Sequence, residues 1–256
     1  MTAVALVLLL AQSPDAFYER GVALFREGKL DAAIGPLEEA VRVNPNKPPY
    51  LKALGVVHAA RGDYSLAEPF FQRACQIDPK EEDVCYYLGR ALYALNRFEP
   101  AVPALEKALK NDRQPFRVYL GLAQALEALG RNEEAEKNFK LAVDKNRSQR
   151  PDEDPRIYYG VFLFRQARLD EAREVFEKAA RALPQSSRAR FEFGRALYQS
   201  GKTEEAEKEL KRAVELQPGY GAAHLLLSKV YQRLGRAAEA EKHGRLGGQA
   251  AGQANQ

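Results

Sequence analysis

The sequence repeats itself at a fixed interval, and this period constrains the fold more than any other feature. One alanine recurs in an Ala-rich segment of each unit, and successive copies lie 34, 34, 34, 37, 34 and 34 residues apart. Tandem units of this length indicate a solenoid, in which each unit packs only against its neighbours. The seven alanines are Ala33, Ala67, Ala101, Ala135, Ala172, Ala206 and Ala240.

Other positions keep the same period and predict two helices in each unit. A small residue such as Gly89 lies twelve positions before the alanine, and a turn former such as Asn96 lies five before it. A large apolar residue follows the alanine after four positions, and a second alanine follows after seven. Proline closes four of the units. Each unit therefore reads as a helix, a short turn and a second helix, with a small residue where the helices cross.

One segment carries the resemblance to a known family most clearly. Tyr87-Leu88-Gly89-Arg90-Ala91-Leu92-Tyr93, followed by Ala101, Leu105 and Ala108, resembles the tetratricopeptide repeat pattern. The resemblance extends over about residues 14 to 254. It implies an all-α, right-handed superhelical solenoid of seven helix-turn-helix repeats. In such a solenoid the first helices line a concave groove that binds peptides or partner proteins.

The three extra residues of the long interval divide the array. We expect repeats one to four in residues 14–149, an insert or joint at 150–152, and repeats five to seven in 153–246. The segment 247–256 has neither charge nor a large apolar side chain, so we expect a disordered tail. Pro36, Pro69 and Pro103 fall near the start of second helices, where we expect slight kinks and no breaks.

The first 13 residues contain an apolar run, Ala3 to Ala11, that is too short to span a bilayer. It resembles the hydrophobic part of a secretory signal, although the positive segment that normally precedes it is missing. The alternative is a helix that caps the first repeat. We expect an exported, periplasmic protein with no stable membrane span, and a cytoplasmic protein is the alternative.

Composition and motifs favour binding over catalysis. The 39 basic and 35 acidic residues nearly cancel to a net charge of +4, and no basic run occurs, so nucleic acid is not an expected partner. His58, His224 and His243 lie far apart in the sequence without metal-ligand spacing, and we interpret His58 as a packing residue. There is no glycine-rich phosphate loop and no nucleophile-like turn. We therefore expect no enzyme activity, no cofactor and no metal.

Cys75 and Cys85 flank the connection between two repeats. They lie at similar distances from the turn between two antiparallel helices, so a disulfide is geometrically possible. An oxidising compartment would favour that bond. The alternative is a pair of small buried packing residues. Their spacing is not a CxxC, so redox catalysis is not expected.

The resemblance assigns a peptide-binding groove to the inward side of the first helices. Two repeats share one arrangement there, Tyr86-x3-Arg90-x2-Tyr93 and Phe191-x3-Arg195-x2-Tyr198, which puts an arginine between two rings on one helix face. Such a face suits an acidic and aromatic partner. The alternative is that the rings pack between repeats. The predicted groove residues are Tyr18, Phe25, Lys52, Tyr86, Arg90, Tyr93, Arg117, Phe164, Arg165, Phe191, Arg195 and Tyr198.

These observations lead to one functional hypothesis and one rival. In the family, a Lys-Asn pair grips the C-terminal carboxylate of chaperones, but Val56 stands where the asparagine that would accompany Lys52 should be. A chaperone clamp is therefore not expected. We expect a non-catalytic scaffold that binds other proteins or peptides in the groove. The alternative is the docking arm of an enzyme complex whose catalytic part lies on another chain.

Overall fold

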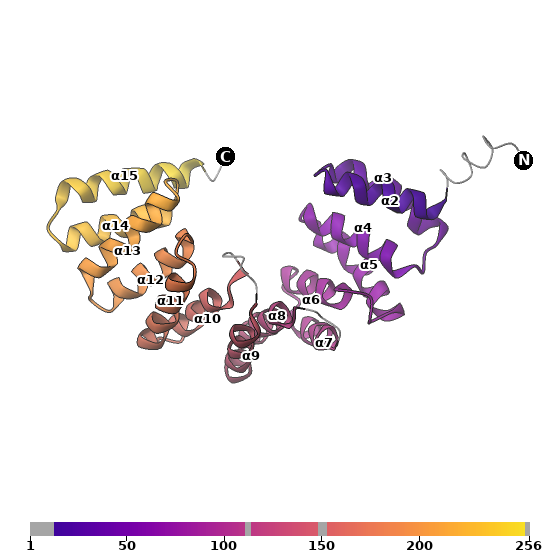
Figure 1. The fold of residues 1–256 in the computed structure, drawn as a ribbon, viewed down its shortest axis with the longest axis horizontal. Helices are drawn as coiled ribbons and strands as arrows, with labels where there is room; N and C mark the ends of the chain where they lie inside the picture. Colours follow the sequence, from indigo (N-terminus) through magenta and orange to yellow (C-terminus); the bar gives the residue numbers. More distant parts are fainter. Residues whose placement is uncertain (1–12, 111–113, 148–152, 254–256) are drawn as a thin grey trace, which may run out of the picture. The chain divides into compact units, whose positions relative to one another are not determined.

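Paired helices make up the whole regular structure of the described residues. The computed structural model describes residues 13–110, 114–147 and 153–253 (Figure 1). The predicted all-α class is confirmed, since every regular element in these ranges is a helix. The helices are α2 (Pro14–Arg26), α3 (Leu30–Val43), α4 (Pro48–Ala60), α5 (Tyr64–Ile77), α6 (Val84–Ala94), α7 (Phe98–Ala108), α8 (Pro115–Ala128), α9 (Asn132–Lys145), α10 (Pro155–Arg165), α11 (Leu169–Ala182), α12 (Ser187–Gln199), α13 (Thr203–Leu216), α14 (Gly221–Arg233) and α15 (Ala237–Gln253).

Two compact units divide the chain, Met1–Asn138 and Phe139–Gln256, which we call unit 1 and unit 2. The division falls inside α9, whereas the predicted joint at 150–152 lies outside the described residues. In unit 1 the pairs α2–α3, α4–α5 and α6–α7 pack together, and each pair also packs on the next. In unit 2 the pairs α10–α11, α12–α13 and α14–α15 do the same. Stacking of this kind defines a helical-repeat solenoid.

Turns within the pairs need a left-handed residue, as the sequence pattern predicts. Most repeats place a glycine there, for example Gly62 with φ of 86°. Asn96 and Ala167 take the same conformation with φ of 56° and 58°. Ala167 is the costly case, because its Cβ crowds the backbone in this region. Ala167 is not a turn-forming residue type, yet its turn keeps the left-handed conformation of the others.

Helix crossings explain the small residues of the repeat. A Cβ added to Gly160 would lie 2.5 Å from Cε1 of Phe176, and one added to Gly194 would lie 2.7 Å from Cγ of Leu210. In these two pairs the first helix thus approaches the large apolar residue of the second helix at a position where only glycine fits, whereas α8 and α14 carry Ala123 and Ser228 at the equivalent position. The landmark alanines are buried, Ala101 and Ala206 completely so.

The internal prolines do not interrupt their helices. Pro36, Pro69 and Pro103 lie inside α3, α5 and α7, which continue past them. Pro36 is the seventh residue of α3, and Pro69 and Pro103 are the sixth residues of α5 and α7, so they lie beyond the first turn where the sequence placed them. Each proline removes one backbone donor from its helix, which is stabilised by packing on its partner helix.

The structure tests the sequence-based expectation at only one end of the array. The apolar run lies among residues 1–12, outside the described residues, and Ser13 caps α2 by accepting a hydrogen bond from the Ala16 N–H at 3.1 Å. The expected disordered tail needs correction, because α15 continues through residues 247–253. Gly247 is buried against α14, where an added Cβ would lie 2.6 Å from Cγ of Leu225, so its lack of a side chain permits the packing.

Candidate functional site

The first helices of neighbouring repeats contact one another and form what we call the first-helix face. In unit 1 the contacts join α2 to α4, α4 to α6 and α6 to α8. In unit 2 they join α10 to α12 and α12 to α14. All predicted groove residues lie on these helices.

A cavity of about 310 Å³ opens between α4 and α6 in unit 1. Tyr86, Arg90 and Tyr93 all contribute to its wall, so the first ring–arginine–ring arrangement surrounds one space. Arg90 is exposed and donates a hydrogen bond to Oε1 of Gln124 on α8 at 3.2 Å. The cavity is lined by Val56, Ala59, Ala60, Tyr64, Phe71, Tyr86, Tyr87, Arg90, Ala91, Tyr93 and Ala94.

Apolar groups form most of that wall, for a reason visible in the sequence. Ala59 and Ala60 at the end of α4 leave the space open, while Phe71 and Tyr87 stack at 5.5 Å beneath it. Tyr93 packs against Phe98 of α7 at 5.3 Å. An apolar hollow with a guanidinium at its edge can hold a large apolar side chain beside a carboxylate.

Other predicted groove residues of unit 1 have contacts within the protein. Lys52 forms an ion pair with Glu81 at 2.5 Å. Arg117 pairs with Asp83 and lies 4.5 Å above the Tyr86 ring. Tyr18 stacks on Tyr50 at 5.1 Å, and Phe25 packs on the core of the first two repeats. These side chains join one repeat to the next, as the alternative interpretation of the rings expected.

The second ring–arginine–ring arrangement has different surroundings in unit 2. Arg195 lies 4.3 Å above the Phe164 ring of α10, and its terminal nitrogen is 2.7 Å from a carboxylate oxygen of Glu192. Phe191 packs on Tyr220 at 5.0 Å. Arg233 covers the Tyr198 ring at 3.9 Å. Arg195 lies on the same helix face as its two neighbouring rings, but only 30% of its side chain is exposed and it stacks on a ring of the preceding repeat.

Glu192 is the residue on this face that sequence reasoning missed. It lies three positions before Arg195 on α12, and 8% of the residue is exposed. Burial raises the pKa of its carboxyl, while the charges of Arg195, Arg188 and Arg165 act to lower it. A Glu–Arg pair at i,i+3 was a signal in the sequence, but such pairs usually lie on solvated helix surfaces.

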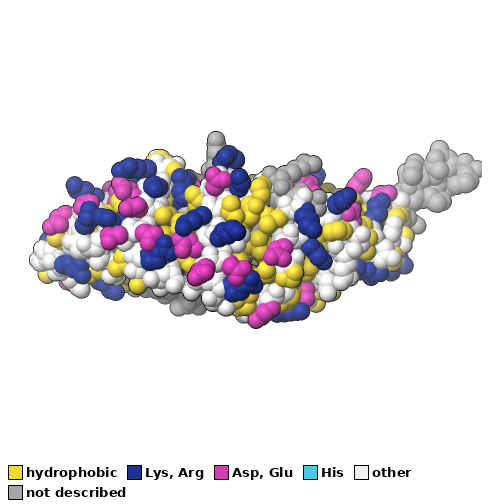
Figure 2. Space-filling view, turned by 90° about the horizontal axis from the view of Figure 1, so that it is seen from below, with side chains coloured by type: hydrophobic (Ala, Val, Ile, Leu, Met, Phe, Trp, Pro, Cys, Tyr) yellow, Lys and Arg dark blue, Asp and Glu magenta, His cyan; other side chains and the backbone are white. Residues whose placement is uncertain are grey.

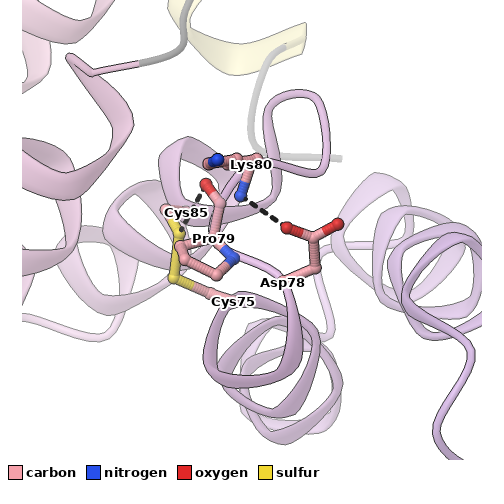
Figure 3. The surroundings of a disulfide bond; sticks show 5 residues. All are labelled: Cys75, Asp78, Pro79, Lys80 and Cys85. Atoms are coloured by element: carbon pink, nitrogen blue, oxygen red, sulfur yellow. Dashed lines mark hydrogen bonds between the residues drawn. A yellow bond between two sulfur atoms is a disulfide. The ribbon is translucent and has the colours of Figure 1, made fainter.

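The disulfide between Cys75 and Cys85 joins α5 to α6, and therefore one repeat to the next (Figure 3). The two Cα atoms lie 5.1 Å apart, and both cysteines are buried. In the connection between them, the Lys80 N–H donates to Oδ1 of Asp78 at 2.9 Å. The structure thus brings the pair together across the turn, as the spacing allowed.

Two histidines that lie 19 positions apart in the sequence are in contact in unit 2. Nδ1 of His224 on α14 is 2.9 Å from Nδ1 of His243 on α15, and Nε2 of His224 is 2.9 Å from the Pro218 carbonyl oxygen. His58 is buried and stacks on Phe70 at 5.9 Å, which confirms its packing role. Among the described residues, no group of three or more His, Cys, Asp or Glu side chains is arranged to hold a metal ion.

The surface charge is mixed where it can be seen directly. On the face shown in Figure 2, acidic and basic side chains are interspersed with apolar ones. Within the described ranges, no helix combines the length and apolar character needed to cross a membrane.

Comparison with known proteins identifies the protein family to which this fold belongs. Models of the tetratricopeptide repeat match residues 3–50, 18–82, 58–115, 116–148, 163–218 and 191–254. The chain belongs to the tetratricopeptide repeat family, whose members are protein-interaction scaffolds and typically not catalysts. No curated protein matches the chain.

Solved structures agree on the fold. A tetratricopeptide repeat protein from Parabacteroides merdae superimposes with a TM-score of 0.71 at 16% identity, covering 93% of both chains. Pseudomonas aeruginosa pilF gives 0.66 at 20% identity, covering 84% of this chain and 97% of its own. YrrB, described as a TPR protein with an unusual peptide-binding site, gives 0.52 at 20% identity, covering 73% of this chain and 95% of its own.

Proposed function

We propose that the protein is a non-catalytic scaffold that binds an extended segment of a partner protein on the first-helix face of unit 1. A large apolar side chain of the partner enters the cavity between α4 and α6, and a neighbouring acidic group pairs with Arg90. The observation that carries the proposal is the cavity itself. Its wall is mostly apolar, and the exposed guanidinium of Arg90 on α6 lies at its edge.

Size and chemistry both support this occupant. About 310 Å³ is at the lower end of the range for small-ligand pockets and suits a single side chain better than a whole ligand. Arginine can pair with a carboxylate through two parallel hydrogen bonds, and an exposed one loses little hydration before the partner arrives. The similarity to YrrB adds a family precedent, because that protein has a peptide-binding site.

The test uses partners captured by the full chain from its native organism, with affinities then measured by calorimetry. Ala59→Phe fills the cavity with the residue found at the equivalent position of unit 2, Phe164. Arg90→Glu reverses the charge at its edge. We expect each change to weaken binding at least about tenfold, which is about 1.4 kcal/mol, while the melting temperature stays within a degree or two.

Lys107→Glu is the matched control, since this exposed lysine lies on α7, a second helix. It should bind like the wild type. Wild-type affinity in both Ala59→Phe and Arg90→Glu would reject this site. Equal weakening by Lys107→Glu would mean that total charge drives association.

We also propose that the protein is exported and works in an oxidising compartment such as the periplasm. The disulfide supports this, because such bonds persist outside reducing cytosol, and so does the apolar run at residues 3–11. Alkylation of protein isolated from its native compartment, followed by mass spectrometry, tests the proposal. Two alkylated thiols at Cys75 and Cys85 would contradict it.

A further inference from the structure

The cavity of unit 1 lies at the boundary between two repeats. Its wall is shared between α4 and α5 of the second repeat, which contribute Ala59 and Phe71, and α6 of the third, which contributes Tyr86. The buried core cluster beside it contains Ala67, Phe71 and Ala91. Atoms that line an open space lack packing partners across it, so this boundary forgoes apolar contacts that would otherwise join the two repeats.

The third repeat also begins irregularly. α4, α12 and α14 each start 19 residues before the landmark alanine of their repeat and have 13 residues, whereas α6 starts 17 residues before Ala101 and has 11. The connection before α6, 78–83, has six residues, compared with four at 44–47 and 217–220. It ends at Asp83, which has a left-handed φ of 64° and makes no side-chain hydrogen bond to cap the helix. The first turn of α6 is therefore poorly supported by its own sequence.

The disulfide lies where this support is missing. Cys85 is the second residue of α6, and its bond to Cys75 ties the first turn to α5 (Figure 3). The next residue, Tyr86, lines the cavity. Tyr87 stacks on Phe71, which lies four residues before Cys75 on α5. The cross-link and the wall of the cavity thus share the start of α6 and the same part of α5.

Two ion pairs hold the same connection less rigidly. Lys52 on α4 pairs with Glu81 at 2.5 Å, and Arg117 on α8 pairs with Asp83. All four side chains are partly exposed, and long side chains keep such pairs over a range of backbone positions. The disulfide, by contrast, holds two Cα atoms 5.1 Å apart. The ion pairs therefore keep the connection near the first-helix face, and the disulfide fixes where α6 begins.

We propose that formation of the disulfide completes the binding site of unit 1, so that the protein binds its partner tightly only in the oxidised form. The two thiols pass two electrons and two protons to a disulfide-bearing oxidant, which becomes two thiols while the bond between Cys75 and Cys85 forms. In the dithiol form the first turn of α6 frays, Tyr86 and Tyr87 leave their positions, and the cavity loses one wall. This inference rests on the proposed function and adds its regulation by the redox state of the surroundings.

The experiment measures the affinity of a fluorescein-labelled peptide, Ser-Gly-Phe-Glu-Gly-Ser, for the full chain by fluorescence anisotropy. Its phenylalanine and glutamate supply the apolar side chain and the acid of the proposed function. A second peptide, with alanine in place of phenylalanine, measures binding outside the cavity. Both are titrated into the oxidised chain, the chain reduced with dithiothreitol, and the chain carrying Cys75→Ala with Cys85→Ala. Far-UV circular dichroism gives the folded fraction of each form, and affinities refer to that fraction, so partial unfolding does not imitate the effect.

We expect the oxidised chain to bind the phenylalanine peptide about tenfold more tightly than the reduced chain. The chain carrying Cys75→Ala with Cys85→Ala should bind like the reduced chain and should not respond to dithiothreitol, which controls for the reductant itself. Hydrogen exchange in the first turn of α6 should become faster on reduction, while exchange in α12 stays unchanged. The alanine peptide should bind every form weakly.

Equal affinity in the oxidised and reduced chains, or tighter binding by the reduced chain, would overturn the inference and leave the proposed function standing. Weaker binding without faster exchange in α6 would overturn it too, since the wall of the cavity would then not depend on the bond. If the oxidised chain bound both peptides equally, the proposed occupant of the cavity would be contradicted, and this inference would fall with it.

Discussion

The two ring–arginine–ring arrangements share a spacing and differ in almost everything around it. In unit 1, Ala59 and Ala60 leave a cavity beside Arg90, which is exposed. Three repeats later, Phe164 and Arg165 occupy the equivalent positions, and Arg195 lies flat on the Phe164 ring. A single motif thus borders an apolar hollow in one unit and a packed charge cluster in the other.

The residue after the first ring adds to the contrast. Tyr87 stacks on Phe71 under the cavity of unit 1, whereas its counterpart Glu192 is buried beside Arg195 in unit 2. The positions that hold a repeat together are nearly invariant between units, such as Ala101 and Ala206. The chemistry of the face therefore depends on the residue after the first ring and on the residues that the preceding first helix contributes, and the motif alone does not determine it.

Charge reversal should separate the two arginines most strongly. Arg195→Glu places a second acid beside the buried Glu192 and removes a stacked cation, so we expect a loss of about 3 kcal/mol in unfolding free energy. Arg90→Glu, at an exposed position, should change it by no more than about 0.5 kcal/mol. Urea unfolding followed by far-UV circular dichroism measures both. Equal losses would show that the surroundings do not distinguish the two sites.

Reduction of the disulfide should destabilise unit 1 and leave unit 2 unchanged. The bond closes a loop with a sequence separation of 10, and the chain-entropy estimate gives about 2–3 kcal/mol for a loop of this size. Hydrogen exchange with and without reductant checks this, because it follows α5–α6 and α12–α13 separately. Cys75→Ala with Cys85→Ala is the control and should behave like the reduced protein. Faster hydrogen exchange in α12–α13 after reduction would contradict the prediction that the disulfide stabilises unit 1 alone.

Enlarging a crossing alanine should cost the same in either unit. Ala101 and Ala206 are completely buried, so Ala101→Leu and Ala206→Leu each overpack a helix crossing by roughly 1–3 kcal/mol. The melting temperatures of the two variants test this. Equal decreases would show that the helix crossings are alike in both units, although the first-helix face differs between them. Melting within a degree of the wild type in both would mean that these crossings tolerate volume.

Lowering the pH should have the smallest effect on stability of the changes considered, and it should act mainly on unit 2. The Pro218 carbonyl can only accept, so His224 donates through Nε2 and the facing Nδ1 atoms of His224 and His243 can share a single proton. Burial, followed by the charge of His224, lowers the pKa of His243. The unfolded chain therefore binds the proton more readily, and the stability present above about pH 6.5 declines as the pH falls below it.

The decline should be roughly 1–2 °C in melting temperature, because His243 is partly exposed. The melting temperature is measured at neutral and at mildly acidic pH. The difference between the two values should be smaller in His243→Gln than in the wild type. Burial also lowers the pKa of His58 in unit 1, so His58→Leu is the companion variant and should flatten it less. If the melting temperature of His243→Gln fell with acid as much as that of the wild type, the His224–His243 pair would not be the cause of the acid sensitivity.

The sequence predicted the framework well because packing inside a repeat is local. The left-handed turns at Gly62 and Asn96 and the close approach at Gly160 follow from residue types at fixed spacing. The pairing of His224 with His243 could not be read in this way, because it depends on how α15 rotates against α14. The stacking of Arg195 on Phe164 likewise depends on two side-chain rotamers in different repeats.

The bond between Cys75 and Cys85 also sets how the chain would respond to mechanical force. A solenoid pulled by its ends can lose repeats one at a time, because each contacts only its neighbours. At the boundary between α5 and α6, tension passes through the sulfur atoms and bypasses the connection. About 35 Å of backbone, for a sequence separation of 10, would therefore stay unextended until the bond is reduced. In single-molecule stretching, the full extended length would reveal the redox state of this one link.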